Sequence, residues 1–304
     1  CTRTGAVSGG AAAARVFAAA GAKVVLLARS RAEIDTLAAE IGPAALALRC
    51  LGTDPGAAVL EVLLGGLVVM TDTPVVVAVT GARGLVVVTT SSGSRRLAAT
   101  GEVLRLEAGP TPGVRPPVAG LRSYLGVRWG IDAPPVLGSR SRDTLSGLGP
   151  PPVVAGDVLG VGDRVGGPWA EHWHAAGGGG PAVDAASAGA VELDVIPGPR
   201  DDLFPPEAWE VLAGTGHVSG HADRVVVRID PARPVPRLSG GEIPSEGMVR
   251  GAVQVPADGS PVVFGPDHPV TGGYPVIGVL TSRSADVISQ LLPGAPVRFR
   301  RLRG

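Results

Sequence analysis

Residues 242–277 read EIPSEGMVRGAVQVPADGSPVVFGPDHPVTGGYPVI, and this stretch decides the fold. Short apolar runs such as Val262–Phe264 and residues 275–280 alternate in it with Gly and Pro turn signals, which is the pattern of an all-β domain. Charged and hydrogen-bonding side chains stand between these runs. We expect them at the ends of strands, where a rigid sheet aims binding residues.

The composition of the chain supports the same fold class. Its 304 residues are enough for about two domains at roughly 150 residues each. The 46 Gly and 29 Pro residues favour short strands and turns over long helices. The 27 basic residues balance the 27 acidic ones, which leaves no net field for nucleic acid or an anionic membrane. The composition therefore predicts a mainly β protein that binds neither nucleic acid nor a membrane.

The cysteines and histidines offer no metal site that can be recognised from spacing. Cys1 and Cys50 are too few for a disulfide framework or a zinc site, and they fit a reducing cytoplasm. His172 and His174 form a spaced pair inside a Gly-rich segment with no third ligand nearby. We expect a cytoplasmic protein without a bound metal.

The first 50 residues differ in character from the rest. Residues 4–11 read TGAVSGGA and resemble the Thr-Gly-x-x-x-Gly-x-Gly turn of short-chain dehydrogenases, with Ala11 in place of the third glycine. We expect an Ala-rich helix that ends at Gly21, a strand at 24–28 and another strand at 45–48. This order is typical of a short α/β, Rossmann-like beginning over residues 1–50.

Dehydrogenase activity is excluded by the lysine content. That family needs a Tyr-x-x-x-Lys pair, in which the lysine lowers the pKa of the tyrosine. Lys23 is the sole lysine of the chain, and Ala19 stands four residues before it. The alternative to cofactor binding is a nucleotide-fold fragment without a ligand, and we favour that alternative.

A second distinctive block covers residues 121–150. It contains a cluster of hydroxyl and guanidinium groups that includes Ser139, Arg140 and Asp143. Such groups can hold a carboxylate or a phosphate. The alternative is a solvated loop whose polar side chains cap local turns.

Four pieces of sequence carry a resemblance to one known family: YLGVRWGIDAPPVLGSRSRDTLSGLGP (124–150), GPRDD (198–202), PSEGMVRGAVQVPADGSPVVF (244–264) and DHPVTGGYP (267–275). Together they resemble the biotin-dependent carboxyltransferase family, which includes the C-type subunit of 5-oxoprolinase, the second subunit of allophanate hydrolase and urea amidolyase-related proteins. The resemblance extends over about residues 51–300. It implies a mainly β fold of two cyclophilin-like β-barrel units with a cleft between them.

The same resemblance sets the expected domain boundaries. We expect the first unit at 51–165, without the opening segment that the family has there. A Gly/Ala-rich linker follows at 166–190, and the second unit covers 191–304.

The resemblance implies a subunit of an ATP-dependent 5-oxoprolinase, a hydrolase that opens the lactam of 5-oxoproline to glutamate. The alternatives are a carboxyltransferase acting on carboxybiotin and urea, and a non-catalytic regulatory subunit. The chain has no Walker A sequence, so ATP, with Mg²⁺, would be held with a partner subunit. Biotin would be needed only for the carboxyltransferase and would be carried on another chain. The expected partners are a sister subunit of related β fold and a third 5-oxoprolinase subunit, which together make a heteromer.

Both reactions polarise a carbonyl group flanked by nitrogen and need donors aimed at its oxygen. With the resemblance, we predict these catalytic residues: His268, Gln254, Arg250 and Glu246. We predict these substrate-binding residues: Ser139, Arg140, Asp143, Thr271, Gly272, Gly273 and Tyr274.

Each of these assignments has a structural alternative. Arg250 and Glu246 would form only an ion pair, and Gln254 would bind a neighbouring loop backbone. His268 would be a turn residue with a local hydrogen bond, and Tyr274 would only pack in the core. The glycines would serve turn geometry.

Overall fold

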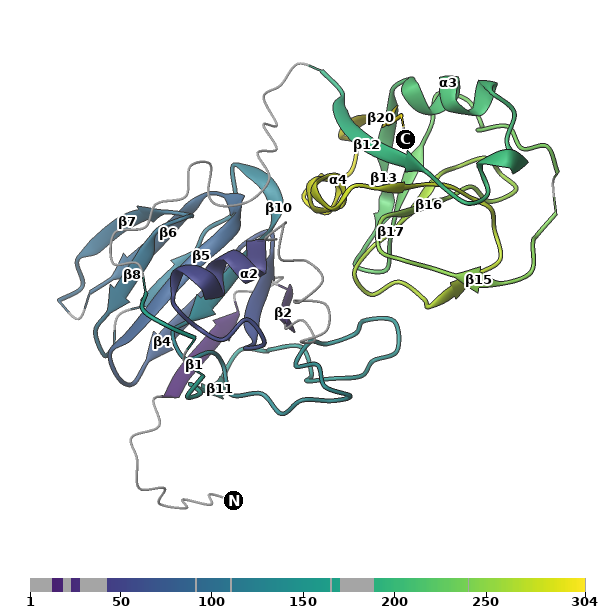
Figure 1. The fold of residues 1–304 in the computed structure, drawn as a ribbon. Helices are drawn as coiled ribbons and strands as arrows, with labels where there is room; N and C mark the ends of the chain where they lie inside the picture. The colour runs from purple at the N-terminus through teal and green to yellow at the C-terminus, as the bar shows by residue number, and fades with distance from the viewer. Residues whose placement is uncertain are drawn as a thin grey trace. The chain divides into compact units, whose positions relative to one another are not determined.

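The structure of the chain is a computed structural model, which describes residues 13–18, 23–27, 43–90, 92–109, 111–164, 166–169, 189–239 and 241–303. The chain folds into two compact units. The first unit comprises residues 1–142 and 148–180, and the second comprises residues 143–147 and 181–304. Figure 1 draws both units and labels most of their elements.

The first unit consists of two antiparallel sheets. The six-stranded sheet has the order β11 (Asp157–Gly160), β1 (Ala13–Ala18), β4 (Leu67–Thr71), β9 (Thr111–Val114), β6 (Leu85–Thr89) and β7 (Arg95–Ala99). The five-stranded sheet has the order β2 (Lys23–Leu27), β3 (Val59–Leu63), β10 (Ala119–Val127), β5 (Val75–Arg83) and β8 (Val103–Leu106). Alternate Val and Leu side chains from both sheets form one shared core, as strands with one buried face require.

Helix α2 (Pro43–Cys50) packs against β10, β5 and β3 of the five-stranded sheet. The contact is close at Gly126, where an added Cβ atom would lie 3.1 Å from Leu51 Cδ1 and 3.2 Å from Ala47 Cβ. Cys50 ends the helix with a buried thiol that donates to Ala47 O at 3.1 Å. Burial raises the pKa of the Cys50 thiol to about 12, so this cysteine is a packing residue.

The expected α/β beginning is only partly present. Residues 13–18 form strand β1 instead of the expected helix, and residues 45–48 lie in helix α2 instead of the expected strand, so both of these predictions are wrong. The strand predicted at 24–28 is present as β2, but it pairs antiparallel with β3, whereas Rossmann strands are parallel. The glycine-rich turn at 4–11 lies outside the described residues.

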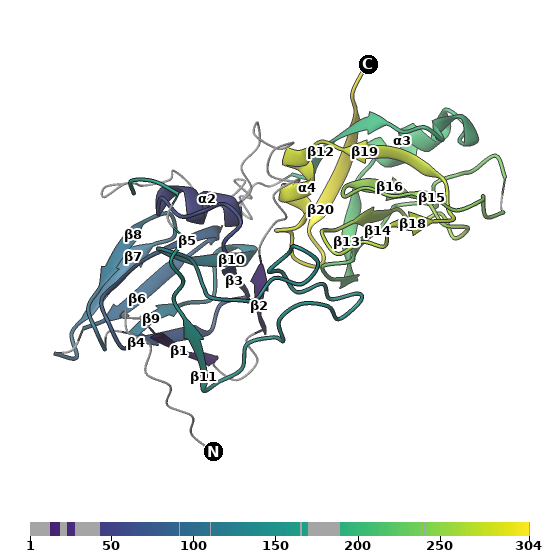
Figure 2. The ribbon, with the colours of Figure 1, turned by 60° about the horizontal axis from the view of Figure 1, so that its bottom comes forward.

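Strand β1 owes its form to pairing. It lies between β11 and β4, with Ala14 opposite Leu159 on one side and Thr71 on the other (Figure 2). Ladder hydrogen bonds on both sides outweigh the helix preference of an Ala-rich segment, because propensity is worth less than about 1 kcal/mol per residue. Residues before Leu51 therefore supply strands to both sheets of the first unit.

The second unit is a closed barrel with the order β12 (Val191–Pro197), β19 (Val276–Leu280), β16 (Ala252–Gln254), β17 (Val262–Phe264), β14 (Val226–Asp230), β13 (Gly216–Ala222) and β20 (Pro296–Arg301). Strand β20 pairs parallel with β12 and antiparallel with β13, which closes the barrel. Helices α3 (Glu207–Ala213) and α4 (Ser282–Ile288) add apolar side chains to its core, and the short helix η2 (Asp201–Leu203) precedes α3. The predicted mainly β fold is confirmed.

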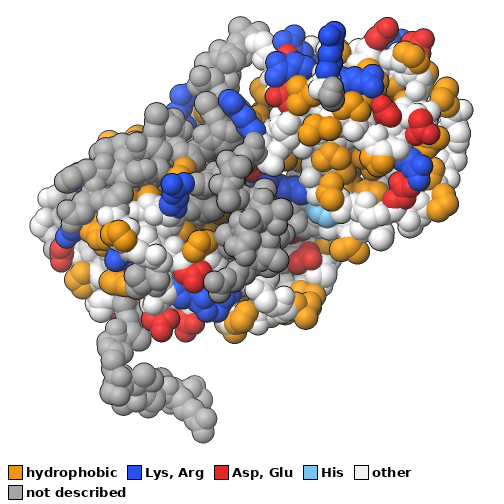
Figure 3. Space-filling model, viewed as in Figure 1, with side chains coloured by type: hydrophobic (Ala, Val, Ile, Leu, Met, Phe, Trp, Pro, Cys, Tyr) orange, Lys and Arg blue, Asp and Glu red, His pale blue; other side chains and the backbone are white. Residues whose placement is uncertain are grey.

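The distribution of charged side chains on the surface agrees with the equal numbers of basic and acidic residues. Figure 3 shows basic and acidic side chains interspersed with apolar ones over the visible face. Within the described part of the chain, no helix has the length and apolar character needed to cross a membrane.

Candidate functional site

A two-stranded sheet beside the barrel brings several of the predicted site residues together. Strand β15 (Glu246–Gly247) pairs antiparallel with β18 (Thr271–Gly272), with Glu246 opposite Gly272 and Gly247 opposite Thr271. Met248 N donates to Val270 O at 2.9 Å and extends this pairing. The two segments are distant in the sequence, and this small sheet is what joins them.

Gln254 lies at the end of β16 and is the buried polar residue of this region. Its side chain is 4% exposed. Its Nε2 donates to Tyr274 O at 2.9 Å and lies 3.5 Å from Met248 Sδ. The structure therefore contains the loop-backbone contact that was the alternative for Gln254. A β-bulge in β19 adjoins this position, because Val253 pairs with Gly278 but Gln254 pairs with Val276.

Gly272 is required by the position of this amide. A Cβ atom added at Gly272 would lie 2.4 Å from Gln254 Nε2 and 3.3 Å from Met248 Cγ. Gly272 does not have a positive φ, so its role is close approach. Gly273 follows it, and Gly273 O accepts a hydrogen bond from Ile243 N at 2.9 Å.

The predicted ion pair between Glu246 and Arg250 is absent, and each of these residues has another partner. Arg200 Nε donates to Glu246 Oε1 at 2.8 Å, and Arg200 Nη2 also contacts this oxygen. Arg250 pairs with Asp286 instead. The ion pair that was the structural alternative for these two residues is therefore not present, because each side chain is paired with a residue distant in the sequence.

The hydrogen bond from Arg200 lowers the pKa of the Glu246 carboxyl. A carboxylate with a lowered pKa is a weaker base. Glu246 is therefore better suited to orient Arg200 than to remove a proton.

His268 stacks on Phe264 with ring centroids 5.9 Å apart and planes 5° apart. Its Nδ1 lies 2.8 Å from Pro269 O. A carbonyl oxygen only accepts, so Nδ1 carries the proton and Nε2 is the acceptor of the neutral ring. The local hydrogen bond of the alternative is present, and it leaves Nε2 for a ligand.

Sequence reasoning missed a buried network beside His268. The Asp267 carboxylate, 7% exposed, accepts from Arg224 Nε and Nη2, both at 2.8 Å. It also accepts from Thr144 N at 2.9 Å and Thr144 Oγ1 at 2.7 Å. Burial alone would raise the pKa of Asp267, but the hydrogen bonds and charge of Arg224 and the two bonds from Thr144 lower it. This network holds residues 143–147 in the second unit.

The remaining predicted residues have local contacts. Asp143 Oδ1 accepts from Leu145 N at 2.8 Å and Ser146 N at 3.2 Å, which is the turn-capping alternative. Ser139 and Arg140 belong to the first unit. There Ser139 Oγ accepts from Ser141 N at 3.1 Å.

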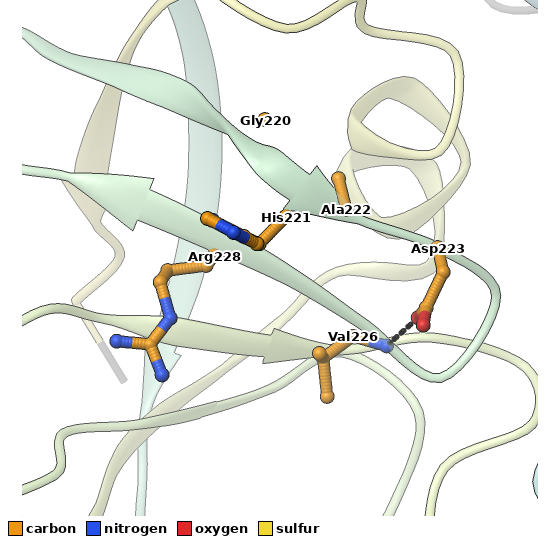
Figure 4. A pocket seen from close by; sticks show the side chains of 6 residues that line it. All are labelled: Gly220, His221, Ala222, Asp223, Val226 and Arg228. Atoms are coloured by element: carbon orange, nitrogen blue, oxygen red, sulfur yellow. Dashed lines mark hydrogen bonds between the residues drawn. The ribbon is translucent and has the colours of Figure 1, made fainter.

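An open hollow also lies on the second unit, lined by Gly220, His221, Ala222, Asp223, Val226 and Arg228 (Figure 4). The side chains of His221 on β13 and Arg228 on β14 border it, and Asp223 Oδ1 accepts from Val226 N at 2.9 Å. It contains none of the predicted site residues.

Comparison with known proteins identifies the family. A family model described as the carboxyltransferase domain, subdomains A and B, matches residues 38–301. The chain belongs to this family. The resemblance expected from residues 124–275 is confirmed, and the match begins earlier than expected.

Two relatives are more than 25% identical to this member of the carboxyltransferase-domain family over the aligned residues. It is 30% identical over 257 residues to the C-type subunit of 5-oxoprolinase from Escherichia coli (strain K12), and the match covers 82% of this chain and 76% of that protein. Crystal structures of TTHA0988 are 28% to 29% identical, with TM-scores of 0.69 to 0.72 over 95% of this chain. The chain spans 56% of the length of TTHA0988 in two of these structures and 99% in a third.

A more distant structure shares the fold. The urea amidolyase of Kluyveromyces lactis is 23% identical, with a TM-score of 0.78 over 96% of this chain. The chain spans 19% of that much longer protein.

The site of this carboxyltransferase-domain protein contains hydrogen-bonding groups and no cluster of metal ligands. Among the described residues, no three His, Cys, Asp or Glu side chains come together as they would around a metal ion. The hydrogen-bonding groups of this region include backbone N–H groups, the Gln254 amide and the His268 imidazole.

Proposed function

We propose that this chain is the C-type subunit of an ATP-dependent 5-oxoprolinase and opens the lactam of 5-oxoproline to glutamate together with two partner subunits. The observation that carries the proposal is the 30% identity to the corresponding E. coli 5-oxoprolinase subunit, since it spans 82% of this chain and 76% of that protein. The similarity therefore includes both units and not a single motif.

The site chemistry agrees with this function. Lactam opening places negative charge on the carbonyl oxygen, and fixed N–H donors stabilise such charge. The His268 imidazole is held through Nδ1 by Pro269 O, which leaves Nε2 to take a proton from an attacking water. Glu246, paired with Arg200, would fix the guanidinium that meets the substrate carboxylate.

ATP would drive the opening when it is bound by the assembled subunits. Among the described residues we find no phosphate-binding loop, and the sequence has no Walker A motif. We therefore assign ATP, with Mg²⁺, to a site completed by a partner subunit, and we place the assembled heteromer in the cytoplasm.

A second candidate function is carboxyl transfer from carboxybiotin to urea, which the fold shared with K. lactis urea amidolyase favours. In that case biotin would be carried on another chain. The sole lysine, Lys23, lies in strand β2, where it is part of a sheet and not of a mobile carrier loop.

The deciding experiment is ATP-dependent glutamate release from 5-oxoproline by this chain mixed with two partner subunits. We expect glutamate only when all three are present, and a loss of about 10²-fold or more with His268→Ala. His221→Ala is the matched control, because His221 lines the separate hollow of Figure 4, and it should keep wild-type activity. No glutamate from a folded, assembled wild-type complex would refute the proposal, and carboxylation of urea would then support the second candidate.

A further inference from the structure

The hydrogen-bond direction at Gln254 differs from the one expected for an oxygen-binding donor. Tyr274 O can only accept, so the side-chain atom that faces it at 2.9 Å must be the amide nitrogen. The same nitrogen also faces Met248 Sδ. The donor half of the Gln254 amide is therefore used within the protein.

The acceptor half of this amide is free. Gln254 Oε1 receives no hydrogen bond from any described residue. The described side-chain N and O atoms that are both shielded from solvent and unpaired belong to Thr53, Thr73 and Arg237. Gln254 Oε1 is not among them, so this oxygen remains within reach of a ligand although the residue is 4% exposed. A side-chain carbonyl oxygen in this position can accept a hydrogen bond from a donor that reaches it.

Free donors lie on the segment that the Gln254 amide touches. The amide contacts this segment at Gly272, through the close approach of Cα, and at Tyr274, through its carbonyl. The N–H groups of Gly273 and Tyr274 donate to no described residue. One short stretch of backbone thus contains two N–H groups without a described acceptor, and the same stretch contacts the nitrogen of the Gln254 amide.

We infer that Gln254 accepts a hydrogen bond from the N–H of a substrate amide while the N–H groups of Gly273 and Tyr274 donate to the carbonyl oxygen of the same amide. A lactam ring holds its N–H and C=O on the same side, and urea presents the same pair of groups. We therefore expect ligands in which an N–H group is bonded to the carbonyl carbon and points to the same side as the carbonyl oxygen. The inference rests on the proposed function, which puts the substrate amide at this site. It makes Gln254 the residue that selects amides over esters.

The test uses two uncharged five-membered rings that differ in one group, 2-pyrrolidinone with N–H and γ-butyrolactone with a ring oxygen. We expect the full wild-type chain, titrated by NMR, to bind the lactam about 10-fold or more tightly than the lactone, the size of one hydrogen bond to a buried acceptor. Gln254→Met should reduce this preference to about twofold or less, because Met has no acceptor of this kind.

The chain offers matched controls. Gln290 is the other glutamine and is 2% exposed, so Gln290→Met removes a buried amide elsewhere in the same unit and should keep the preference. If Gln254→Met does not fold, Gly272→Ala provides a second test, since its Cβ displaces the amide, with Gly247→Ala as its control.

Three outcomes would overturn the inference: binding of neither ring, equal binding of both by the wild type, or an unchanged preference when the Gln254 amide is removed or displaced. The rings carry no carboxylate, and the titration needs neither ATP nor a partner. A failure to release glutamate from 5-oxoproline therefore counts against the proposed function, and a missing lactam preference counts against this inference.

Discussion

Replacing Gly272 by alanine should destabilise the second unit, because the new methyl group cannot fit beside the Gln254 amide. The added Cβ would lie 2.4 Å from Gln254 Nε2 and 3.3 Å from both Gln254 Cδ and Met248 Cγ. Contacts this short force a shift, and the amide can shift only by leaving Tyr274 O. Met248, which the amide nitrogen also contacts, packs in the buried cluster beneath with Ala252 and Val276.

The expected magnitude follows from that hydrogen bond. Losing it and leaving the buried carbonyl or amide unpaired costs about 1 to 3 kcal/mol. With a urea m-value on the order of 2 kcal/mol/M, the unfolding midpoint of the second unit should fall by about 0.5 to 1.5 M. Urea unfolding followed by hydrogen exchange in peptides from β16 and β17 would report this change for the second unit alone.

Gly247→Ala is the matched control, because Gly247 lies opposite Thr271 in the same small sheet and has no atom within 4 Å of its added Cβ. Neither glycine has a positive φ, so the two substitutions have the same backbone cost. Gly247→Ala should change the free energy of unfolding by no more than about 0.5 kcal/mol. Equal stability of the two variants would refute the argument that Gly272 is a glycine because of the Gln254 amide.

Three other predictions concern burial and charge. The pKa of Asp267 is lower in the folded chain than in the unfolded chain, where it is about 3.9. The ionised carboxylate therefore stabilises the fold at pH values above about 3.9, and this stability is lost as pH falls through the pKa of the folded state. Urea unfolding from about pH 6 to 3 should therefore show that the free energy of unfolding falls more steeply in the wild type than in Asp267→Asn. The Asn variant leaves Arg224 without its carboxylate at every pH. Parallel curves of the two proteins would contradict this prediction. The pKa of Cys50 is raised to about 12, so its thiol should react with iodoacetamide at about pH 8 only after unfolding. Peptide mass spectrometry measures this labelling. Fast labelling of the native chain would exclude a buried thiol. Gly126→Ala should destabilise the first unit by about 1 to 3 kcal/mol, because the added Cβ pushes α2 away from β10. Gly113→Ala is the control, since the nearest atom to its added Cβ is 3.8 Å away, and it should change the free energy of unfolding little. Equal urea midpoints of the two variants would show that α2 shifts without cost.

The strands of the second unit could be predicted from the sequence because their signal is local. Short apolar runs between Gly and Pro turns mark β17 and β19, and the structure has strands there. The beginning of the chain could not be predicted this way. Residues 13–18 are Ala-rich and favour a helix, and only pairing with β4 and β11, which are distant in the sequence, makes them a strand.

Helix α2 shows the opposite error. Residues 45–48 form a short apolar run, and periodicity alone does not separate a buried helix from a buried strand over such a length. The available signals were Pro43 at the first helical position and Arg49 in the last turn. Both are typical of helix ends, whereas the strand prediction followed only from the βαβ-like order of the preceding residues.

The composition of the candidate site was more predictable than its connections. The segments that contain Glu246, Gln254 and Gly272 do lie together, but the partner of Glu246 is 46 residues away in the sequence and that of Arg250 is 36 residues away. Asp267 was missed because its partners, Arg224 and Thr144, are 43 and 123 residues away. No spacing rule for a single segment detects such pairs.

The role of Gln254 depends on a level of detail that residue type does not contain. A glutamine can donate or accept, and its place in a polar motif led to the prediction of a donor. Because Tyr274 O takes the amide nitrogen, only the oxygen is left for a ligand, and the donors must come from the backbone at Gly273 and Tyr274. The recognition that we propose thus changes from an oxygen alone to an adjoining N–H and C=O, which a lactam and urea share and an ester does not. Discrimination between these two amide-type substrates must then come from groups that contact the rest of the molecule, such as a cation for the carboxylate that 5-oxoproline carries and urea lacks.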